Sequence, residues 1–425
     1  MKRLLFIAHR VPYPPDKGER VRAFHEIRAL AEHFRVTVAA LAHTPADVQA
    51  AHELKRWCER VITARAGGRA GLLRGAAALL RGKSVTEGYF HSRRLARSLT
   101  DEAANGPFDV IVAYSSSALP YALAVPARAR VADLVDADSA KWAAYAQSAR
   151  WPKSWLYRRE ARGVGRLEQR ALQACDAVVL VSRAEAEALD LASDKVIAVG
   201  NGVDTDTFQP QARPQDGPPT LVFTGTMDYR PNVEGVCWFA EEIWPALRRA
   251  RPDLRLAIVG RDPALAVRRL AETPGVDVTG SVPDVRPYLA RATLAVAPLL
   301  MARGIQNKVL EAMAMGRAVV ASPAALEGLE VQPSAEVIEA QAADEWQREI
   351  LDLLENDARR QPIEQAARSC VERRYTWEAR LKPLVDLCTR LASAPVTMVS
   401  AEPGLKDEKQ PAQGTEPIRP EAATR

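Results

Sequence analysis

Short apolar runs alternate with amphipathic stretches along most of the chain. Apolar runs of this length are typical of buried strands, and apolar residues spaced three and four apart are typical of helices. In residues 20–34, for example, Val21, Phe24 and Ile27 recur at the helical spacing. Strands that alternate with helices predict an α/β protein with parallel sheets covered on both faces. The expected strands are residues 4–8, 36–41, 61–64, 109–113, 131–135, 177–181 and 196–199 in the first half, and 220–224, 254–259, 276–279, 294–297 and 318–321 in the second.

The alternation breaks once, at a segment rich in turn-forming residues. A GNGVD turn lies at residues 200–204, and residues 210–219 read PQARPQDGPP. Because 425 residues are about twice a common domain length, two domains are expected. The predicted division is a first domain at 1–209, a linker at 210–219 and a second domain at 220–392, whose last helices could pack back on the first. Residues 393–425 lose their aromatics and are predicted to be a disordered tail.

Composition is that of an ordinary globular protein, with 47% hydrophobic and 26% charged residues. The five cysteines are scattered and form no Cys-x-x-Cys pair. This usage argues against a disulfide framework and a zinc site, and it fits a reducing cytoplasm. No apolar run reaches the roughly 18 residues that a membrane-spanning helix needs, so none is expected.

The whole chain has a net charge of +5, and its positive charge concentrates in the first half. Between residues 55 and 97, only Glu59 and Glu87 oppose a series of Lys and Arg side chains. This pattern indicates an anionic partner, such as phospholipid, a lipid diphosphate or nucleic acid. A solvated basic face without a partner explains the same pattern.

The densest candidate chemistry lies at residues 304–316, GIQNKVLEAMAMG, just before an apolar strand. A glycine turn leads into a short helix on which Lys308 and Glu311 share one face. Backbone N–H groups at such a helix start attract anions, and a Lys beside them strengthens the attraction. Glu311, one turn later, is placed to accept hydrogen bonds from sugar hydroxyls. A phosphate site beside a sugar site predicts a pocket for a nucleotide sugar.

Three other loops follow predicted strands and carry candidate residues. Gly18 permits close approach of a phosphate, although a plain loop-to-helix turn explains it as well. No GxGxxG motif follows the first strand, which argues against a dinucleotide-dependent dehydrogenase. Asp136 is placed to orient or deprotonate an acceptor hydroxyl, whereas Asp138 or Ser139 is expected to cap the next helix. Arg230 either neutralises a diphosphate leaving group or forms a surface salt bridge.

These motifs together resemble the retaining glycosyltransferases of GT-B fold (glycosyltransferase family 4-like), which include sucrose synthases, bacterial-type glycogen synthases and phosphatidylinositol mannosyltransferases. The resemblance covers about residues 1–390. The segments NKVLEAMAMG, YRPNVEG and DLVDADSAKW more narrowly resemble bacterial sugar transferases that accompany exosortase (PEP-CTERM) and exopolysaccharide clusters. The other carriers are the Gly18 loop, NGVD at 201–204, FTGTM at 223–227, the Val-Gly at 259–260, TGSV at 279–282 and KVLEAMAMGRAVVAS at 308–322.

The resemblance implies two facing Rossmann-like domains with the active site in the cleft between them. The first domain would bind the acceptor and the second the nucleotide sugar. No metal and no cofactor is implied, because helix dipoles and basic side chains would stabilise the departing diphosphate. The predicted catalytic residues are Asp136, Arg230 and Lys308, and the predicted donor-binding residues are Gly18, Gly225, Thr226, Arg303, Gly304, Ile305, Asn307 and Glu311.

Some family positions differ in this chain. Glu311 aligns with the second Glu of a paired-Glu motif, which holds the ribose hydroxyls. The first Glu of that motif, eight positions earlier, falls on Arg303. The basic residues of the first loop in the second domain fall on Thr226 and Asn232, so other cations, Lys308 among them, would have to supply their charge.

The sequence thus predicts a cytoplasmic, metal-independent, retaining hexosyltransferase in bacterial exopolysaccharide biosynthesis. Its donor would be a nucleotide-diphosphate sugar and its acceptor a glycan or a polyprenyl-diphosphate-linked glycan. Peripheral contact with anionic inner membrane is expected, and contact with nucleic acid is not. Two alternatives remain open: a nucleotide-sugar 2-epimerase on the same fold, and a non-enzymatic scaffold that binds sugar nucleotides, suggested by the altered Glu and cations.

Overall fold

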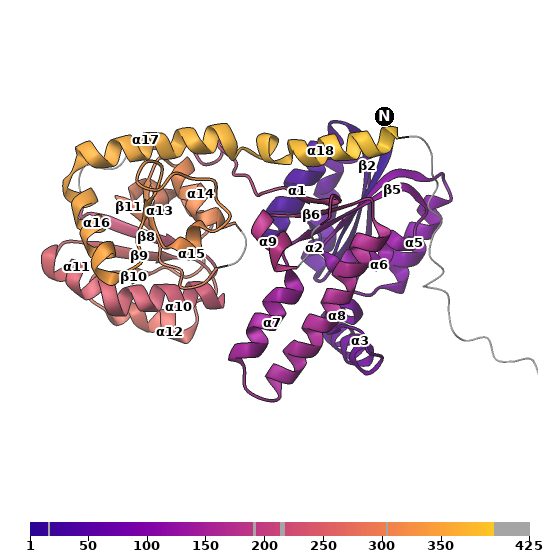
Figure 1. Ribbon diagram of the computed structural model, residues 1–425, viewed down its shortest axis with the longest axis horizontal. Helices are drawn as coiled ribbons and strands as arrows, with labels where there is room; N and C mark the ends of the chain where they lie inside the picture. Colours follow the sequence, from indigo (N-terminus) through magenta and orange to yellow (C-terminus); the bar gives the residue numbers. More distant parts are fainter. Residues whose placement is uncertain (16–17, 190–192, 213–216, 303–304, 395–425) are drawn as a thin grey trace, which may run out of the picture.

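A computed structural model describes residues 1–15, 18–189, 193–212, 217–302 and 305–394. The chain forms two parallel β-sheets with their covering helices, and the two units lie side by side along the long axis (Figure 1). The α/β architecture expected from the alternating pattern is confirmed. The predicted disordered tail falls, beyond residue 394, outside the described residues.

The first sheet holds seven strands in the order β3-β2-β1-β4-β5-β6-β7, and the pairings are parallel. Each predicted run of the first half overlaps one strand. The strands are β1 (Lys2–Ala8), β2 (Phe34–Ala42), β3 (Arg60–Arg65), β4 (Phe108–Tyr114), β5 (Ala127–Val135), β6 (Ala177–Leu180) and β7 (Val196–Ala198). The helices of this half are α1 (Gly18–Ala31), α2 (Pro45–Glu53), η1 (Leu54–Arg56), α3 (Gly68–Leu80), α4 (Val85–Tyr89), α5 (Arg93–Ala103), η2 (Ser116–Ala118), α6 (Leu119–Leu123), α7 (Asp138–Ser148), α8 (Lys153–Ala174) and α9 (Arg183–Ala188).

The second sheet holds six strands in the order β10-β9-β8-β11-β12-β13, again parallel. Its edge strand β13 was not predicted, because two residues are too few to give an apolar run. The strands are β8 (Thr220–Thr224), β9 (Arg255–Val259), β10 (Val276–Val278), β11 (Leu294–Ala297), β12 (Ala318–Ala321) and β13 (Ile338–Glu339). The helices are α10 (Arg230–Trp238), η3 (Phe239–Ile243), α11 (Trp244–Ala250), α12 (Leu265–Arg269), η4 (Leu270–Glu272), α13 (Arg286–Arg291), α14 (Asn307–Ala314), α15 (Pro323–Leu326), α16 (Ala343–Glu355), α17 (Asp357–Arg374) and α18 (Trp377–Ser393).

The helical stretch that follows the loop after β8 is interrupted in the structure. After α10 the backbone passes through the π-helical turn η3 before α11 begins at Trp244. Pro245 explains the interruption, because it has no N–H to donate to the carbonyl four residues earlier. A π-type turn absorbs such a missing bond within an otherwise helical path.

The last helix joins the two units. While α17 covers the second sheet, α18 continues along the same side and lies over the first sheet (Figure 1, yellow). Trp377 and Leu384 of α18 are buried in the same core cluster as Val36 and Val38 of β2. The end of the described chain therefore stabilises the half in which the chain begins.

A chain of buried polar contacts runs from the first sheet toward the second unit. Arg22 of α1 is 1% exposed and pairs with Glu26 at 2.7 Å and with Asp133 at 2.8 Å. Arg22 also donates to Oδ1 of Asn201 at 3.1 Å. The amide of Asn201 donates in turn to Oδ1 of Asn307, at the start of α14, at 3.2 Å. The NGVD turn therefore connects the polar core of the first unit to the helix that carries Lys308.

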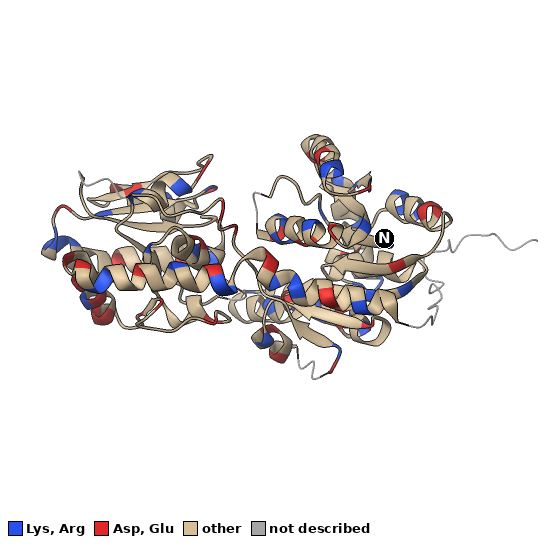
Figure 2. Cartoon of the chain, turned by 90° about the horizontal axis from the view of Figure 1, so that it is seen from above, with Lys and Arg blue, Asp and Glu red and all other residues tan. Residues whose placement is uncertain are grey.

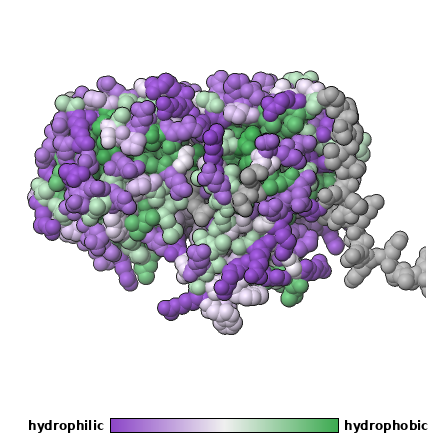
Figure 3. All heavy atoms as spheres, in the orientation of Figure 1, coloured by the Kyte–Doolittle hydropathy of each residue, from purple (hydrophilic) through white to green (hydrophobic). Residues whose placement is uncertain are grey.

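Hydrophilic residues cover much of the face shown in Figure 3, with hydrophobic residues visible among them. Within the described ranges, no helix has the length and apolar character that crossing a bilayer requires.

Strand order places one reversal point in each sheet. Successive strands run outward from β1 through β2 to β3, and β4 then returns to the other side of β1. The second sheet repeats this order, with β8 between β9 and β11. Because adjacent loops diverge at such a point, the carboxyl edge of the sheet opens into a crevice that commonly binds ligands. In the second unit, this reversal point lies between β8 and β11, and the loops that follow these two strands border it.

Candidate active site

Lys308 lies at the reversal point of the second sheet. Its ammonium donates to Oδ1 of Asn232 and sits 4.4 Å from the ring centroid of Phe223, the penultimate residue of β8. Asn232 is itself held by a hydrogen bond from its Nδ2 to the carbonyl of Thr226, 2.9 Å long. The loop after β8 and the start of α14 therefore meet at one cation.

Gly225 leaves the space that this arrangement requires. A Cβ atom at this position would lie 2.7 Å from Nδ2 of Asn232 and 3.3 Å from Nζ of Lys308. Gly260, at the end of the neighbouring strand, has a similar function, since its Cβ would lie 1.6 Å from the carbonyl oxygen of Gly225. Both glycines allow the loops to approach closely enough to form the crevice.

Burial brings the ionisation of Lys308 and Glu311 near neutrality. Desolvation lowers the pKa of Lys308 to about 7, and the charge of Glu311 opposes this shift. Desolvation likewise raises the pKa of Glu311 to about 7, opposed by Lys308. A phosphate placed at this cation would favour its charged form and raise the pKa of Lys308 again. Binding of an anionic ligand should therefore change the protonation of this pair.

Arg261 is a second cation at this edge that sequence reasoning missed. Its guanidinium donates to Oγ1 of Thr226 at 3.5 Å, and its carbonyl accepts from the N–H of Met227 at 2.8 Å. The available signal was its position directly after strand β9 and Gly260, at the carboxyl edge of the sheet. Arg261 contacts Thr226 of the loop after β8, and Lys308 contacts Asn232 of the helix that follows this loop.

The start of α14 is open. Ile305 is 7% exposed and belongs to the core of the second unit. Among the described residues, no side-chain hydrogen bond caps the helix at Gln306, and first-turn N–H groups of this kind can bind an anionic ligand. Asn307 follows and contacts Asn201. Arg303 and Gly304, two predicted donor residues, lie outside the described residues.

Asp136 lies at the carboxyl end of the first sheet, just after β5. The preceding residue, Val135, has a φ of +68°, a conformation that a β-branched residue rarely adopts and that often marks a functional loop. Burial raises the pKa of Asp136 to about 7; Glu185 adds to this shift and Lys141 opposes it. A carboxyl group with this pKa is suited to exchange protons near neutral pH.

Asp138 does not cap α7, contrary to expectation. It is the first residue of the helix, and the cap position is held by Ala137. Carboxylates from other helices supply the missing acceptors: Glu185 accepts from the N–H of Ala137 at 2.6 Å, and Glu168 from that of Ser139 at 3.0 Å. The local sequence could not reveal a cap that tertiary packing provides.

Two residues of the loop after β8 contact the first unit. Tyr229 lies near Tyr145, Lys141 and Asp136, and its pKa is raised by burial first and by Tyr145 next. The guanidinium of Arg230 donates to Glu234 at 2.6 Å and to Ser148 at 2.7 Å. Arg230 therefore lies where the units meet and forms the surface ion pair that was its alternative explanation. Neither Glu234 nor Ser148 is one of the residues that the structure groups around Lys308.

Gly18 begins α1 and is exposed, with open space where a Cβ would lie. No neighbouring chain segment requires a glycine there. The space around it is available to a ligand, although the structure does not bring Gly18 into the Lys308 group.

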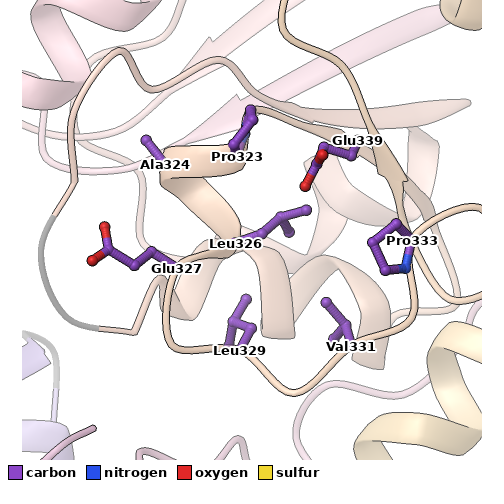
Figure 4. Close-up of a pocket in the computed structure, with 8 residues that line it drawn as sticks. All are labelled: Pro323, Ala324, Leu326, Glu327, Leu329, Val331, Pro333 and Glu339. Atoms are coloured by element: carbon purple, nitrogen blue, oxygen red, sulfur yellow. The ribbon is translucent and has the colours of Figure 1, made fainter. Parts of the chain in front are cut away.

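A separate pocket of about 450 Å³ lies beside α15 (Figure 4). Apolar side chains such as Leu326, Leu329 and Val331 line it, and its charged members are Glu327 and Glu339. Among the described lining residues these two carboxylates have no cation beside them, and alone they would repel a diphosphate. The charges of the Lys308 crevice suit such a ligand better.

Comparison with known proteins agrees with this geometry. Residues 218–356, which include Lys308, match the family described as Glycosyl transferases group 1. No curated protein matches the sequence.

Three solved structures share the fold. A sucrose-phosphate synthase from Thermosynechococcus elongatus is 18% identical, with a TM-score of 0.69 over 92% of this chain and 99% of that chain. HepE from Anabaena, in complex with UDP and glucose, is 15% identical, with a TM-score of 0.65 over 92% of this chain and 100% of that chain. A mutant of TarM from S. aureus, in complex with Fondaparinux, alpha-GlcNAc-glycerol and UDP, is 10% identical, with a TM-score of 0.64 over 93% and 100%.

The two parallel sheets with their helices therefore define an α/β protein of the GT-B fold. Its second unit carries the match to Glycosyl transferases group 1.

Proposed function

We propose that the chain is a retaining glycosyltransferase that transfers a sugar from a nucleoside diphosphate sugar to a glycan acceptor. The observation that carries this proposal is the Lys308 ammonium, held by Asn232 at the reversal point of the second sheet. The family match of residues 218–356 and the UDP named with the HepE and TarM structures support the same ligand class.

In the proposed reaction, the bond between the anomeric carbon and the β-phosphate oxygen breaks, and the nucleoside diphosphate leaves with the electron pair. The acceptor oxygen forms the new bond on the same face of the sugar, and its proton passes to a base. Lys308 and Arg261 stabilise the charge that develops on the departing diphosphate, aided by the first N–H groups of α14. No metal or cofactor takes part in this scheme.

The remaining residues position the two substrates. Glu311 accepts hydrogen bonds from the ribose hydroxyls, and Gly225 lets the loop after β8 approach the donor. From the facing unit, Asp136 orients or deprotonates the acceptor hydroxyl, for which its raised pKa is suitable. We assign the acceptor to the class of lipid-linked glycans of exopolysaccharide biosynthesis, reached at an anionic membrane surface. That assignment rests on sequence resemblance and on the basic first half of the chain.

A donor screen tests the proposal and its two rivals. Purified protein is heated with UDP-, GDP- and ADP-sugars, and one donor is expected to raise the melting temperature by mass action. The same donor should slowly release nucleoside diphosphate without acceptor, as water replaces the acceptor hydroxyl. Release of a 2-epimerised sugar would identify an epimerase instead. Binding of a donor without any turnover, with or without glycan acceptors, would support the non-enzymatic scaffold instead.

The titration of Lys308 predicts a pH-dependent affinity for UDP. Since its pKa is about 7 without ligand, the lysine is largely neutral above pH 7, and binding of the anion must take up a proton. UDP affinity measured by calorimetry should therefore fall from pH 7 to pH 9, by up to about tenfold per pH unit. Lys308→Arg keeps its charge and should show a nearly flat profile. Equal profiles for both proteins would contradict the role of Lys308.

A further inference from the structure

A further cavity, separate from the Lys308 crevice and from the pocket beside α15, is lined by residues of the first half of the chain. It has a volume of about 640 Å³ and is bordered by α3, α4, α6, the start of α5 and a turn of α8. Its lining shares no residue with the Lys308 crevice. Its cationic lining residues are Arg65, Arg74, Arg81, Lys83, Arg93 and Arg170.

The positive charges of Arg65, Arg74 and Arg81 in this cavity have no acidic partner within ion-pair distance among the described residues. Glu87 is the acidic residue of the lining, and it already pairs with Lys83 at 2.6 Å. Elsewhere acidic and basic residues intermingle on both units (Figure 2). A concave wall with this excess of cations attracts anions strongly.

Arg74 carries an unused donor inside this wall. Its Nε is buried and has no hydrogen-bond partner in the part of the chain that the structure describes. A buried donor without an acceptor costs free energy, which a bound anion would recover. Arg74 thus gives a reason, independent of the overall charge, for an acceptor group to occupy the cavity.

The neutral groups of the wall do not supply that acceptor. The Tyr121 hydroxyl accepts from the N–H of Ser92 at 2.5 Å and donates to the carbonyl of Phe90 at 2.7 Å. Burial lowers the pKa of His91, and so do the charges of Arg74 and Lys83. A neutral imidazole adds no negative charge, so the wall offers mostly donors.

We propose that this cavity is a second anion site, which binds a phosphate or diphosphate group separately from the nucleotide-sugar crevice. Guanidinium groups match phosphate oxygens through paired N–H donors, and Arg74 and Arg81 lie on one face of α3. The cavity is large enough for a diphosphate. The proposal depends on Arg65, Arg74, Arg81 and Lys83, and not on the nature of the donor.

The phosphate could belong to a soluble ester or to a lipid headgroup, and α3 bears on that choice. Its outer surface exposes Leu72, Leu73 and Leu80, whose exposed fractions are 62%, 73% and 90%. Exposed leucines beside arginines are typical of a helix that rests on an anionic membrane. The two sources share the same phosphate chemistry, and experiment can separate them.

Inorganic pyrophosphate serves as the first probe, measured by calorimetry on the full chain. The Lys308→Ala background removes the competing cation of the donor crevice, so success or failure of the donor proposal does not affect the result. In this background pyrophosphate should bind, and Arg74→Met should weaken binding by about tenfold to a hundredfold, as expected for a lost charge-assisted hydrogen bond. Arg81→Met, on an exposed residue at the end of α3, gives a second variant should Arg74→Met not fold.

Arg94→Met is the matched control, because Arg94 is an exposed arginine of α5 outside the cavity lining. It should leave pyrophosphate affinity unchanged. Absence of binding, or equal binding in the cavity variants and the control, would overturn the proposal. Flotation with phosphatidylglycerol vesicles then separates the sources: loss of vesicle binding in both Arg74→Met and Leu72→Ser indicates a lipid headgroup, whereas pyrophosphate binding without vesicle binding indicates a soluble ester.

Discussion

Lys308→Ala is expected to lower kcat for sugar transfer by about a hundredfold to a thousandfold, the usual cost of removing one group that stabilises a departing anion. This loss is expected because Lys308 is the cation that Asn232 holds near the end of strand β8. Since the charge on the leaving diphosphate grows in the transition state, kcat should fall more than the donor KM rises. Steady-state kinetics with the donor identified by screening measure both constants.

Two controls make this result specific. Lys308→Arg keeps the charge with a different shape and should retain more activity than Lys308→Ala. Arg230→Ala, which loses the bonds to Glu234 and Ser148, should disturb the contact between the units more than the chemistry. If Lys308→Ala kept normal turnover of the correct donor, the assignment of the diphosphate to this crevice would be wrong.

Arg22→Leu is expected to lower the free energy of unfolding by about 3–5 kcal/mol, the range observed when one partner of a buried ion pair is removed. The guanidinium of Arg22 compensates Glu26 and Asp133, both fully buried. Without it, these two carboxylates would face each other in the core. Urea unfolding at pH 8, followed by circular dichroism, measures the difference.

The size of this loss should depend on pH. Burial and the nearby Asp133 raise the pKa of Glu26 well above its usual range, although Arg22 opposes the shift. Removing Arg22 raises it further, so acid protonates the carboxyl and relieves part of the penalty. The destabilisation should therefore be smaller at pH 5 than at pH 8. Arg35→Leu is the control: its pair with Glu59 is exposed, so the loss should be at most about 1 kcal/mol at either pH. Equal losses for the two variants would contradict the buried network.

The elements were largely predictable because their signals are local. An apolar run such as residues 318–321 has the length and composition of a buried strand, and β12 occupies the same residues. β13 was not predicted because two residues give no periodicity. The break at Pro245 is also hidden in the pattern, because the helical spacing continues across the proline.

The candidate site was predictable only in part. Lys308 and Glu311 share a helical face by spacing alone, so their proximity could be foreseen. Arg261 was missed: its position after β9 was visible in the sequence, but its contact with Thr226 depends on the pairing of β8 with β9, two strands far apart in the chain. The start of α7 likewise depends on Glu168 and Glu185, which belong to two later helices.

The sequence by itself determined the alternating α/β pattern, the two units and the shared helical face of Lys308 and Glu311. These features depend on periodicity and on groups within one turn of helix. Only the tertiary structure decided that Arg261 lies beside Thr226, that Arg22 is buried between two carboxylates, and that Arg74 and Arg81 line a cavity. Those features depend on contacts between distant segments, and burial there sets both the pKa values and the strength of each charge.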